Sequence, residues 1–186
     1  MGNRIEVIGM AGMFASGKDT LADYLVEKHG YRHLSTGDMV REIAQEKHGS
    51  IERPVLFETA KELRETEGPG ALVIEALKKG QPIVITGIRS LGEMNEIHKA
   101  GGIMVFVDAP LEIRYERMRS RSRDKEHMLS IEEFAANEQK EWYGGPLDSD
   151  FNLRDIKQHA DIIIDSSVPL EEFIASGTEA IFSFNS

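Results

Sequence analysis

The chain has 186 residues, of which 40% are hydrophobic and 29% are charged, and its formal net charge is −10. This length and balance suit one folded α/β domain and exclude a disordered chain. The acidic charge argues against a general nucleic-acid binder, and the absence of cysteine excludes disulfides and thiolate metal sites. The run after Met1 is too short for a signal segment or a membrane span, so we expect a cytoplasmic protein.

A glycine-bounded loop follows the first strand-like run, Ile5–Gly9, and leads into a segment with helical spacing. The loop contains the complete pattern G-x-x-x-x-G-K. A strand, a glycine turn and a helix N-terminus point backbone N–H groups at an anion, and Lys18 adds a cation. The residues expected to hold nucleotide phosphates are Gly12, Ala15, Ser16, Gly17, Lys18, Asp19 and Thr20.

Further strand-like runs alternate with helical patterns, which predicts a parallel sheet covered by helices. These runs are Tyr31–Leu34, Pro82–Thr86, Ile103–Asp108 and Asp161–Asp165. The region from Ile51 to Lys79 is helical in pattern and is broken by Gly68-Pro69-Gly70, so it is expected to form a lobe of two helices beside the sheet. A second excursion, roughly Ser122 to Phe151, includes a short helix predicted at Ile131–Trp142.

Arginines fall where the carboxyl ends of these strands are expected, which is where open parallel sheets bind ligands. Arg41 lies in the helix after the second run, and Arg89 follows the third run directly. Two arginines at neighbouring strand ends can hold one phosphate through bidentate hydrogen bonds. The alternative is that each pairs with a nearby carboxylate.

The helix after the fourth run carries four more arginines up to position 121. Arg117 and Arg121 are four residues apart and share a helix face, so we favour anion binding for this pair. For Arg114 and Arg119 we favour a solvated face paired with Glu112 and Glu116.

Three of these segments resemble the adenylate-kinase-related nucleoside monophosphate kinases, in the right chain order. They are Gly17-Lys18-Asp19-Thr20, Ser35-Thr36-Gly37-Asp38-Met39-Val40-Arg41, and Val107-Asp108-Ala109-Pro110 followed by Arg117 and Arg121. Other stretches, among them Glu62-Leu63-Arg64 and Gly87-Ile88-Arg89-Ser90, look like a microbial branch labelled adenylate-kinase-related or dephospho-CoA-kinase-like.

The resemblance implies an α/β, three-layer P-loop NTPase fold with a five-stranded parallel sheet and helices on both faces. The single domain would have its core at residues 1–35, 80–121 and 152–186. A helical acceptor lobe would span about 36–79, and a short lid about 122–151.

The resemblance also implies an ATP- and Mg²⁺-dependent kinase. Its catalytic residues would be Lys18, Arg89, Arg117 and Arg121. The donor adenine would lie against Arg117, Ser167 and Val168. The acceptor would be held by Thr36, Asp38, Arg41, Arg64 and Arg89. The magnesium candidates are Asp19, Thr20 and Asp108, because the third strand ends in Thr86 where the adenylate kinases carry an aspartate.

Three functions stay open at this point. A nucleoside monophosphate acceptor is preferred, because its phosphate is already an anion at neutral pH and needs no general base. An alcohol acceptor such as dephospho-CoA needs a carboxylate to take its proton. Asp38 is available for that, although a role as helix N-cap already explains it. The third alternative is a nucleotide-dependent binding protein with weak ATPase activity.

We expect a small nucleotide as the acceptor partner, no membrane or nucleic-acid partner, and a monomer or homodimer. The six histidines show no metal-ligand spacing and are expected to be surface or packing residues.

Overall fold

A computed structural model describes residues 4–120 and 129–184. Its centre is a five-stranded sheet in the order β2-β3-β1-β4-β5. Every strand pair is parallel, which confirms the expected sheet. The strands are β1 (Val7–Ala11), β2 (Arg32–Ser35), β3 (Ile83–Thr86), β4 (Ile103–Asp108) and β5 (Ile162–Asp165).

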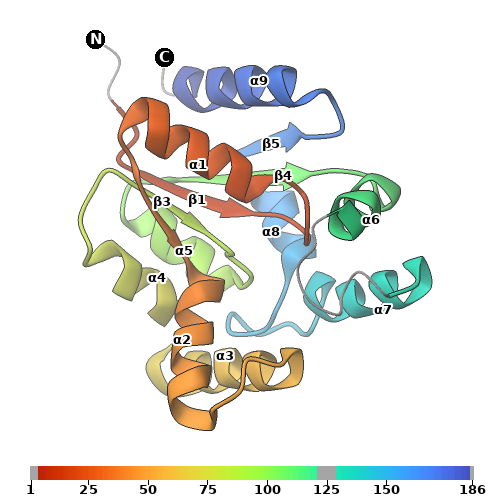
Figure 1. Cartoon of the computed structure of the whole chain (residues 1–186). Helices are drawn as coiled ribbons and strands as arrows, with labels where there is room; N and C mark the ends of the chain where they lie inside the picture. The colour runs from red at the N-terminus through yellow and green to blue at the C-terminus, as the bar shows by residue number, and fades with distance from the viewer. Residues whose placement is uncertain (1–3, 121–128, 185–186) are drawn as a thin grey trace.

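Helices cover both faces of this sheet and make three layers (Figure 1). One face is covered by α1 (Lys18–His29) and α9 (Leu170–Ser183). The other face is covered by α4 (Ala71–Leu77), α5 (Leu91–Lys99) and α8 (Leu153–His159).

Side chains alternate between these two faces along each strand. Ile8 and Val84 pack against α1 and α9, whereas Ile85 and Phe106 pack on the opposite side. Each fully buried aliphatic or aromatic side chain of this kind contributes about 1.5–3 kcal/mol to folding. Strands buried on both faces explain why their sequences are almost continuously apolar.

Two pairs of helices extend from the carboxyl edge of the sheet (Figure 1). One pair is α2 (Thr36–His48), which follows β2, and α3 (Arg53–Glu67). The other pair is α6 (Leu111–Ser120), which follows β4, and α7 (Ile131–Trp142). The helix break expected near Gly68 is confirmed, because α3 ends at Glu67 and α4 begins at Ala71.

The sequence did not reveal helix α8, which is only seven residues long. Its signal is a cap: the Asn152 side chain accepts a hydrogen bond from the Asp155 backbone N–H at 3.1 Å. This helix lies beside α5 on the face of the sheet opposite α1, and its Leu153 and Ile156 are fully buried.

Gly92 and Gly37 both occupy the second position of a helix, but their surroundings differ. A Cβ at Gly92 would lie 2.8 Å from the carbonyl carbon and oxygen of Pro69, which are backbone atoms. A Cβ at Gly37 would meet its nearest atoms, in the side chains of Arg41 and Ser35, at an ordinary 3.5 Å.

We therefore expect opposite effects from the same substitution at these two glycines. Gly92→Ala should lower the free energy of unfolding by about 1–3 kcal/mol, because the turn at Pro69 must move. Gly37→Ala should raise it by up to about 1 kcal/mol, because alanine is the better helix former. Urea denaturation of both variants measures this difference, and equal shifts in the two would contradict it.

Candidate functional site

The loop between β1 and α1 has left-handed backbone at three positions. The φ angles are 148° at Gly12, 59° at Ala15 and 97° at Gly17. A Cβ at Gly12 would lie 2.6 Å from Ser16 Oγ and would overlap the carbonyl oxygen of Val107 in β4. Glycine at position 12 therefore allows the loop to pass close over the sheet.

The loop fits a chain of phosphate groups. The Ser16 hydroxyl is buried and has no hydrogen-bond partner among the described residues. The first backbone N–H groups of α1 have no partner within the helix, and the helix dipole favours an anion there. Lys18 opens the helix with its side chain 11% exposed, and its Nζ lies 3.8 Å from the Asp19 carboxylate. Donors of these types at a helix N-terminus suit nucleotide phosphates.

Ala15 stands where a glycine is common in such loops. A non-glycine residue in left-handed backbone costs about 1 kcal/mol or more. Here the Ala15 methyl group is buried against Met118 of α6 and Phe134 of α7, which offsets that cost. Phe14 lies beside the same Phe134 at 6.2 Å between ring centroids. The apolar loop tip is thus packed onto α6 and α7.

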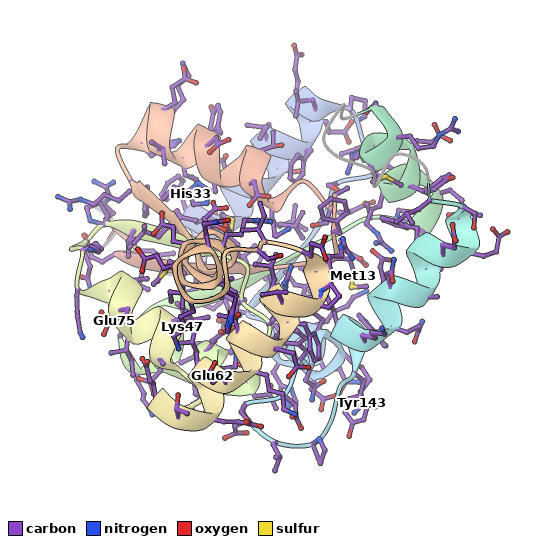
Figure 2. The ribbon with its side chains drawn as sticks, turned by 60° about the horizontal axis from the view of Figure 1, so that its bottom comes forward. Met13, His33, Lys47, Glu62, Glu75 and Tyr143 are labelled. Carbon is purple, nitrogen blue, oxygen red and sulfur yellow. The ribbon has the colours of Figure 1, made fainter. Side chains whose placement is uncertain are left out.

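Met13 lies at the other side of the loop tip and is labelled in Figure 2. It packs in the core on the α5 and α8 face of the sheet. The guanidinium of Arg53, at the start of α3, lies 5.5 Å from the centre of the Phe14 ring. Both helix pairs at the carboxyl edge therefore touch the phosphate loop.

Arg117 joins the loop to the turn after β5. Its Nη1 donates to Ser166 Oγ at 3.0 Å and to the carbonyl oxygen of Ala15 at 3.4 Å. Ser166 Oγ in turn donates to the carbonyl oxygen of Ser16 at 2.5 Å. The structure thus brings Arg117 beside the loop and the turn that carries Ser167 and Val168, and an adenine site there stays a prediction.

In the same turn, the backbone N–H and the hydroxyl of Ser167 both donate to the Asp165 carboxylate, at 2.8 and 2.9 Å. These bonds hold the pKa of Asp165 below its ordinary value, the backbone N–H being the larger cause. These two hydrogen bonds link the turn to the last residue of β5.

The arginines of α6 differ in their environment. Arg121 lies outside the described residues. Arg119 is exposed and lies 3.9 Å from Glu116, as expected for a solvated face. Arg114 is instead buried and donates to Glu138 of α7 and to the carbonyl oxygen of Ala109, so the solvated pairing expected for it is wrong. Burial raises the pKa of the Glu138 carboxyl, and Arg114 opposes that rise.

The carboxylates proposed for magnesium separate into two groups. Asp19 and Thr20 lie in the first turn of α1, beside Lys18. Asp108 lies two residues after Phe106 in β4 and shares its face, so its side chain lies on the face opposite α1. There its carboxylate accepts from Lys157 Nζ of α8 at 2.6 Å. This placement disfavours Asp108 as a metal ligand and leaves Asp19 and Thr20.

On the acceptor side, the hydroxyl of Thr36 donates to the carbonyl oxygen of Gly87 at 2.8 Å. This bond ties the start of α2 to the end of β3. Arg41 pairs with Asp38 at 2.5 Å, and Arg89 pairs with Glu141 at 3.4 Å. Pairing of each arginine with a nearby carboxylate was the alternative to phosphate binding. Both pairs are partly open to solvent, with arginine side chains 51% and 33% exposed.

Arg64 does not share this exposure. Its side chain is 2% exposed, and its Nε and Nη2 donate to Glu93 Oε1 at 3.0 and 2.7 Å. The direct contact with an acceptor that we expected of Arg64 is therefore not favoured. The expected N-cap role of Asp38 is wrong, because Ser35 caps α2 by accepting from the Asp38 backbone N–H at 3.2 Å.

Sequence reasoning missed two polar contacts near the site, one buried and one partly exposed. Glu93 carries a capping box with Ser90, and the S-x-x-E spacing could have revealed it. His33, labelled in Figure 2, places Nε2 2.9 Å from the Thr86 hydroxyl and Nδ1 3.3 Å from Asp23. No pattern in the sequence pairs these three residues, because they come from β2, β3 and α1.

Within the described residues, no helix is long and apolar enough to cross a membrane.

Comparison with known proteins places the chain in a family. Residues 8–144 match the model of the AAA domain family. A UPF0200 protein of Pyrobaculum aerophilum is 32% identical over 174 residues, which cover 90% of this chain and 92% of that protein. A UPF0200/UPF0201 protein of Archaeoglobus fulgidus is 29% identical over 180 residues, and the match spans 91% of this chain but only about half, 53%, of that relative.

Among solved structures, a shikimate kinase from Bacteroides thetaiotaomicron has a TM-score of 0.66 at 13% identity, with 96% of this chain and 99% of that chain covered. At this identity the likeness shows the fold alone, which is a P-loop kinase-like fold. With a matching AAA domain over most of its length and a relative aligned nearly end to end, the chain belongs to the UPF0200 family.

Proposed function

We propose that the protein is an ATP-dependent phosphotransferase whose acceptor carries a phosphate, with a nucleoside monophosphate as the first choice. The observation that carries this proposal is the arrangement along one sheet edge. The phosphate loop follows β1, Arg89 follows the neighbouring β3, and Arg41 lies in the helix that follows β2. Two phosphate-binding groups of residues on one edge suit transfer between two phosphates.

The ion pairs of the two acceptor arginines can be exchanged for a phosphate. Charged hydrogen bonds are typically about 2.8 Å long, so the 3.4 Å contact between Arg89 Nε and Glu141 is loose. The Arg41–Asp38 pair is short but lies at the surface, where such pairs contribute little to stability. The buried pairs Arg64–Glu93 and Arg114–Glu138 differ, because breaking either leaves a desolvated charge.

Phosphoryl transfer is accelerated mainly by positioning and by neutralising charge on the transferred group. In the proposed reaction, Lys18 and the N-terminus of α1 bind the donor phosphates. Arg117 orients the loop through the carbonyl oxygen of Ala15. Arg89 and Arg41 bind and orient the acceptor phosphate. Asp19 and Thr20, in the first turn of α1, are the residues that we propose would hold Mg²⁺, which would neutralise donor charge when bound.

A hydroxyl acceptor is the second candidate, and one observation favours it. Asp38 is not the N-cap of α2, and its carboxylate is 68% exposed at the carboxyl edge of the sheet. This carboxylate pairs with Arg41 at the surface, and an alcohol that replaces Arg41 there can give its proton to it. The fold neighbour is by name a kinase of shikimate, a molecule that bears hydroxyl groups and no phosphate.

A panel of acceptors tests the two candidates. ADP release from ATP and Mg²⁺ would be measured with AMP, CMP, UMP, dephospho-CoA and shikimate, each against water. Acceleration by a monophosphate supports the proposed acceptor, and acceleration only by dephospho-CoA or shikimate replaces it with the second candidate. If ATP binds while no acceptor exceeds the water rate, a nucleotide-dependent binding protein takes its place.

Lys18→Ala and Arg89→Ala should affect different substrates. Lys18→Ala removes the cation beside the donor phosphates, so the Kd of ATP and the turnover rate should both worsen, kcat by about 100-fold or more. Arg89→Ala should leave the Kd of ATP within about twofold and raise the KM of AMP by tenfold or more, about 1.4 kcal/mol or more of binding free energy. Calorimetric ATP binding and steady-state kinetics measure both. An unchanged KM of AMP in Arg89→Ala would remove Arg89 from the acceptor site.

Asp38→Asn tests whether Asp38 acts as a general base or only as the ion-pair partner of Arg41. If the acceptor is a phosphate, loss of the Asp38 charge frees Arg41, and turnover should stay within about threefold of wild type. If an alcohol is the acceptor, kcat should fall by about 10²–10⁴-fold, because the proton acceptor is lost. The same variant assayed with the best acceptor of each class gives the answer.

Glu141→Gln should strengthen binding of the acceptor. The substitution removes the negative charge that faces Arg89 Nε and keeps the size of the side chain. The KM of AMP should fall severalfold, with kcat little changed. Glu116→Gln is a matched control, because Glu116 forms a similar loose pair with Arg119 away from the acceptor arginines. Equal KM values in both variants would show that Glu141 does not compete with the acceptor.

A further inference from the structure

The β3–α5 loop, which carries Arg89, is anchored through one fully buried carboxylate. Glu93 is 0% exposed, and its two oxygens serve different partners. Oε1 accepts from Nε and Nη2 of Arg64 in α3. Oε2 accepts from the backbone N–H of Arg89 at 2.8 Å and from that of Ser90 at 3.3 Å. The side chain of Glu93 therefore links the guanidinium of Arg64 in α3 to the backbone of Arg89, the residue that we propose binds the acceptor.

The other side of Arg89 is held as firmly. Its carbonyl oxygen accepts from the Asn152 backbone N–H at 2.8 Å. The ring of Phe151 lies next to both arginines, 4.8 Å from the Arg64 guanidinium and 5.9 Å from that of Arg89. The backbone of Arg89 is thus fixed at its N–H and at its C=O, and its side chain leaves from a defined point.

Close packing between the lobe and α5 keeps Arg64 and Glu93 in register. Ser90 Oγ donates to the carbonyl oxygen of Pro69 in the turn between α3 and α4. Gly92 leaves no room for a side chain against Pro69. Because Arg64 belongs to α3, a shift of this helix would pull directly on the carboxylate that holds Arg89.

We propose that the buried Arg64–Glu93 ion pair is a positioning device for the acceptor site, through which helix α3 sets the direction of Arg89. This inference rests on the proposed function, because it takes Arg89 as the residue that binds the acceptor. Arg64 and Glu93 act through Arg89 and touch no substrate. They therefore determine how well the acceptor binds, while donor binding is independent of them.

Glu93→Gln tests this proposal with little change of shape. Glutamine has one accepting oxygen and one donating amino group, so it cannot serve the guanidinium and the two backbone N–H groups together. Amide hydrogen exchange at Arg89 and Ser90 should accelerate by tenfold or more. The KM of AMP should rise by about tenfold or more, while the Kd of ATP stays within about twofold.

Ile97→Ala is the matched control. Ile97 is fully buried one turn after Glu93 in α5, so its truncation lowers stability without removing a hydrogen bond of this network. Rescue gives a second criterion, since the KM of Arg64→Lys should fall between wild type and Arg64→Met. If Ile97→Ala raises exchange at Arg89 and the KM of AMP as much as Glu93→Gln does, the pair is only structural and the proposal is wrong.

The exchange measurement needs no turnover. Should wild type fail to use AMP, the proposed acceptor is lost, yet the exchange rates at Arg89 still decide whether Glu93 fixes that backbone. Unchanged exchange in Glu93→Gln would overturn the positioning role by itself.

Discussion

The parallel alignment of the five strands is the constraint on which the site depends. It collects the phosphate loop, Arg89 and the start of α2 along one edge, although these segments are far apart in the sequence. It also assigns every strand residue to one of two faces, because side chains alternate. Thr86 shares the α1 face with Val84, and Asp108 shares the opposite face with Phe106. Thr86 and Asp108 are both polar residues at the end of an apolar strand, but their surroundings differ. Thr86 forms a hydrogen bond with His33, and Asp108 accepts one from Lys157.

This alternation explains which parts of the site were predictable. The loop from Gly12 to Thr20 is local, so its glycines, lysine and helix start could be read directly. The sheet followed from strand-like runs separated by helical patterns. The face of Asp108 was not predictable, because the sequence shows that it lies opposite Val107 but not which face α1 covers. The partners of Arg64 and Arg114 were not predictable either, because Glu93 and Glu138 are 29 and 24 residues away in the sequence.

Local signals also gave a wrong interpretation where two candidates competed. Ser35, Thr36 and Asp38 are all residues that cap helices. The structure selects Ser35, and Asp38 falls in the first turn, where a carboxylate suits the helix dipole. That change has a chemical consequence. Capping no longer explains Asp38, and its exposed carboxylate, which pairs with Arg41, is the group that the proposed hydroxyl acceptor would need as a base.

Among the described residues, four arginine–carboxylate pairs around the site differ in one physical respect, which is access to water. Arg64–Glu93 and Arg114–Glu138 are buried, so a substrate cannot replace the carboxylate without leaving it desolvated and unpaired. Arg41–Asp38 and Arg89–Glu141 are reached by solvent, so an incoming anion can replace the carboxylate and leave it hydrated. The buried pairs thereby fix the framework, and the open pairs leave their arginines accessible to solvent. The backbone of Arg89 is held by Glu93 of the buried pair, and its side chain contacts Glu141, which solvent can reach. The backbone of Arg89 is therefore fixed, while an anion can replace the partner of its side chain. That combination suits the binding of an acceptor phosphate that we propose for Arg89.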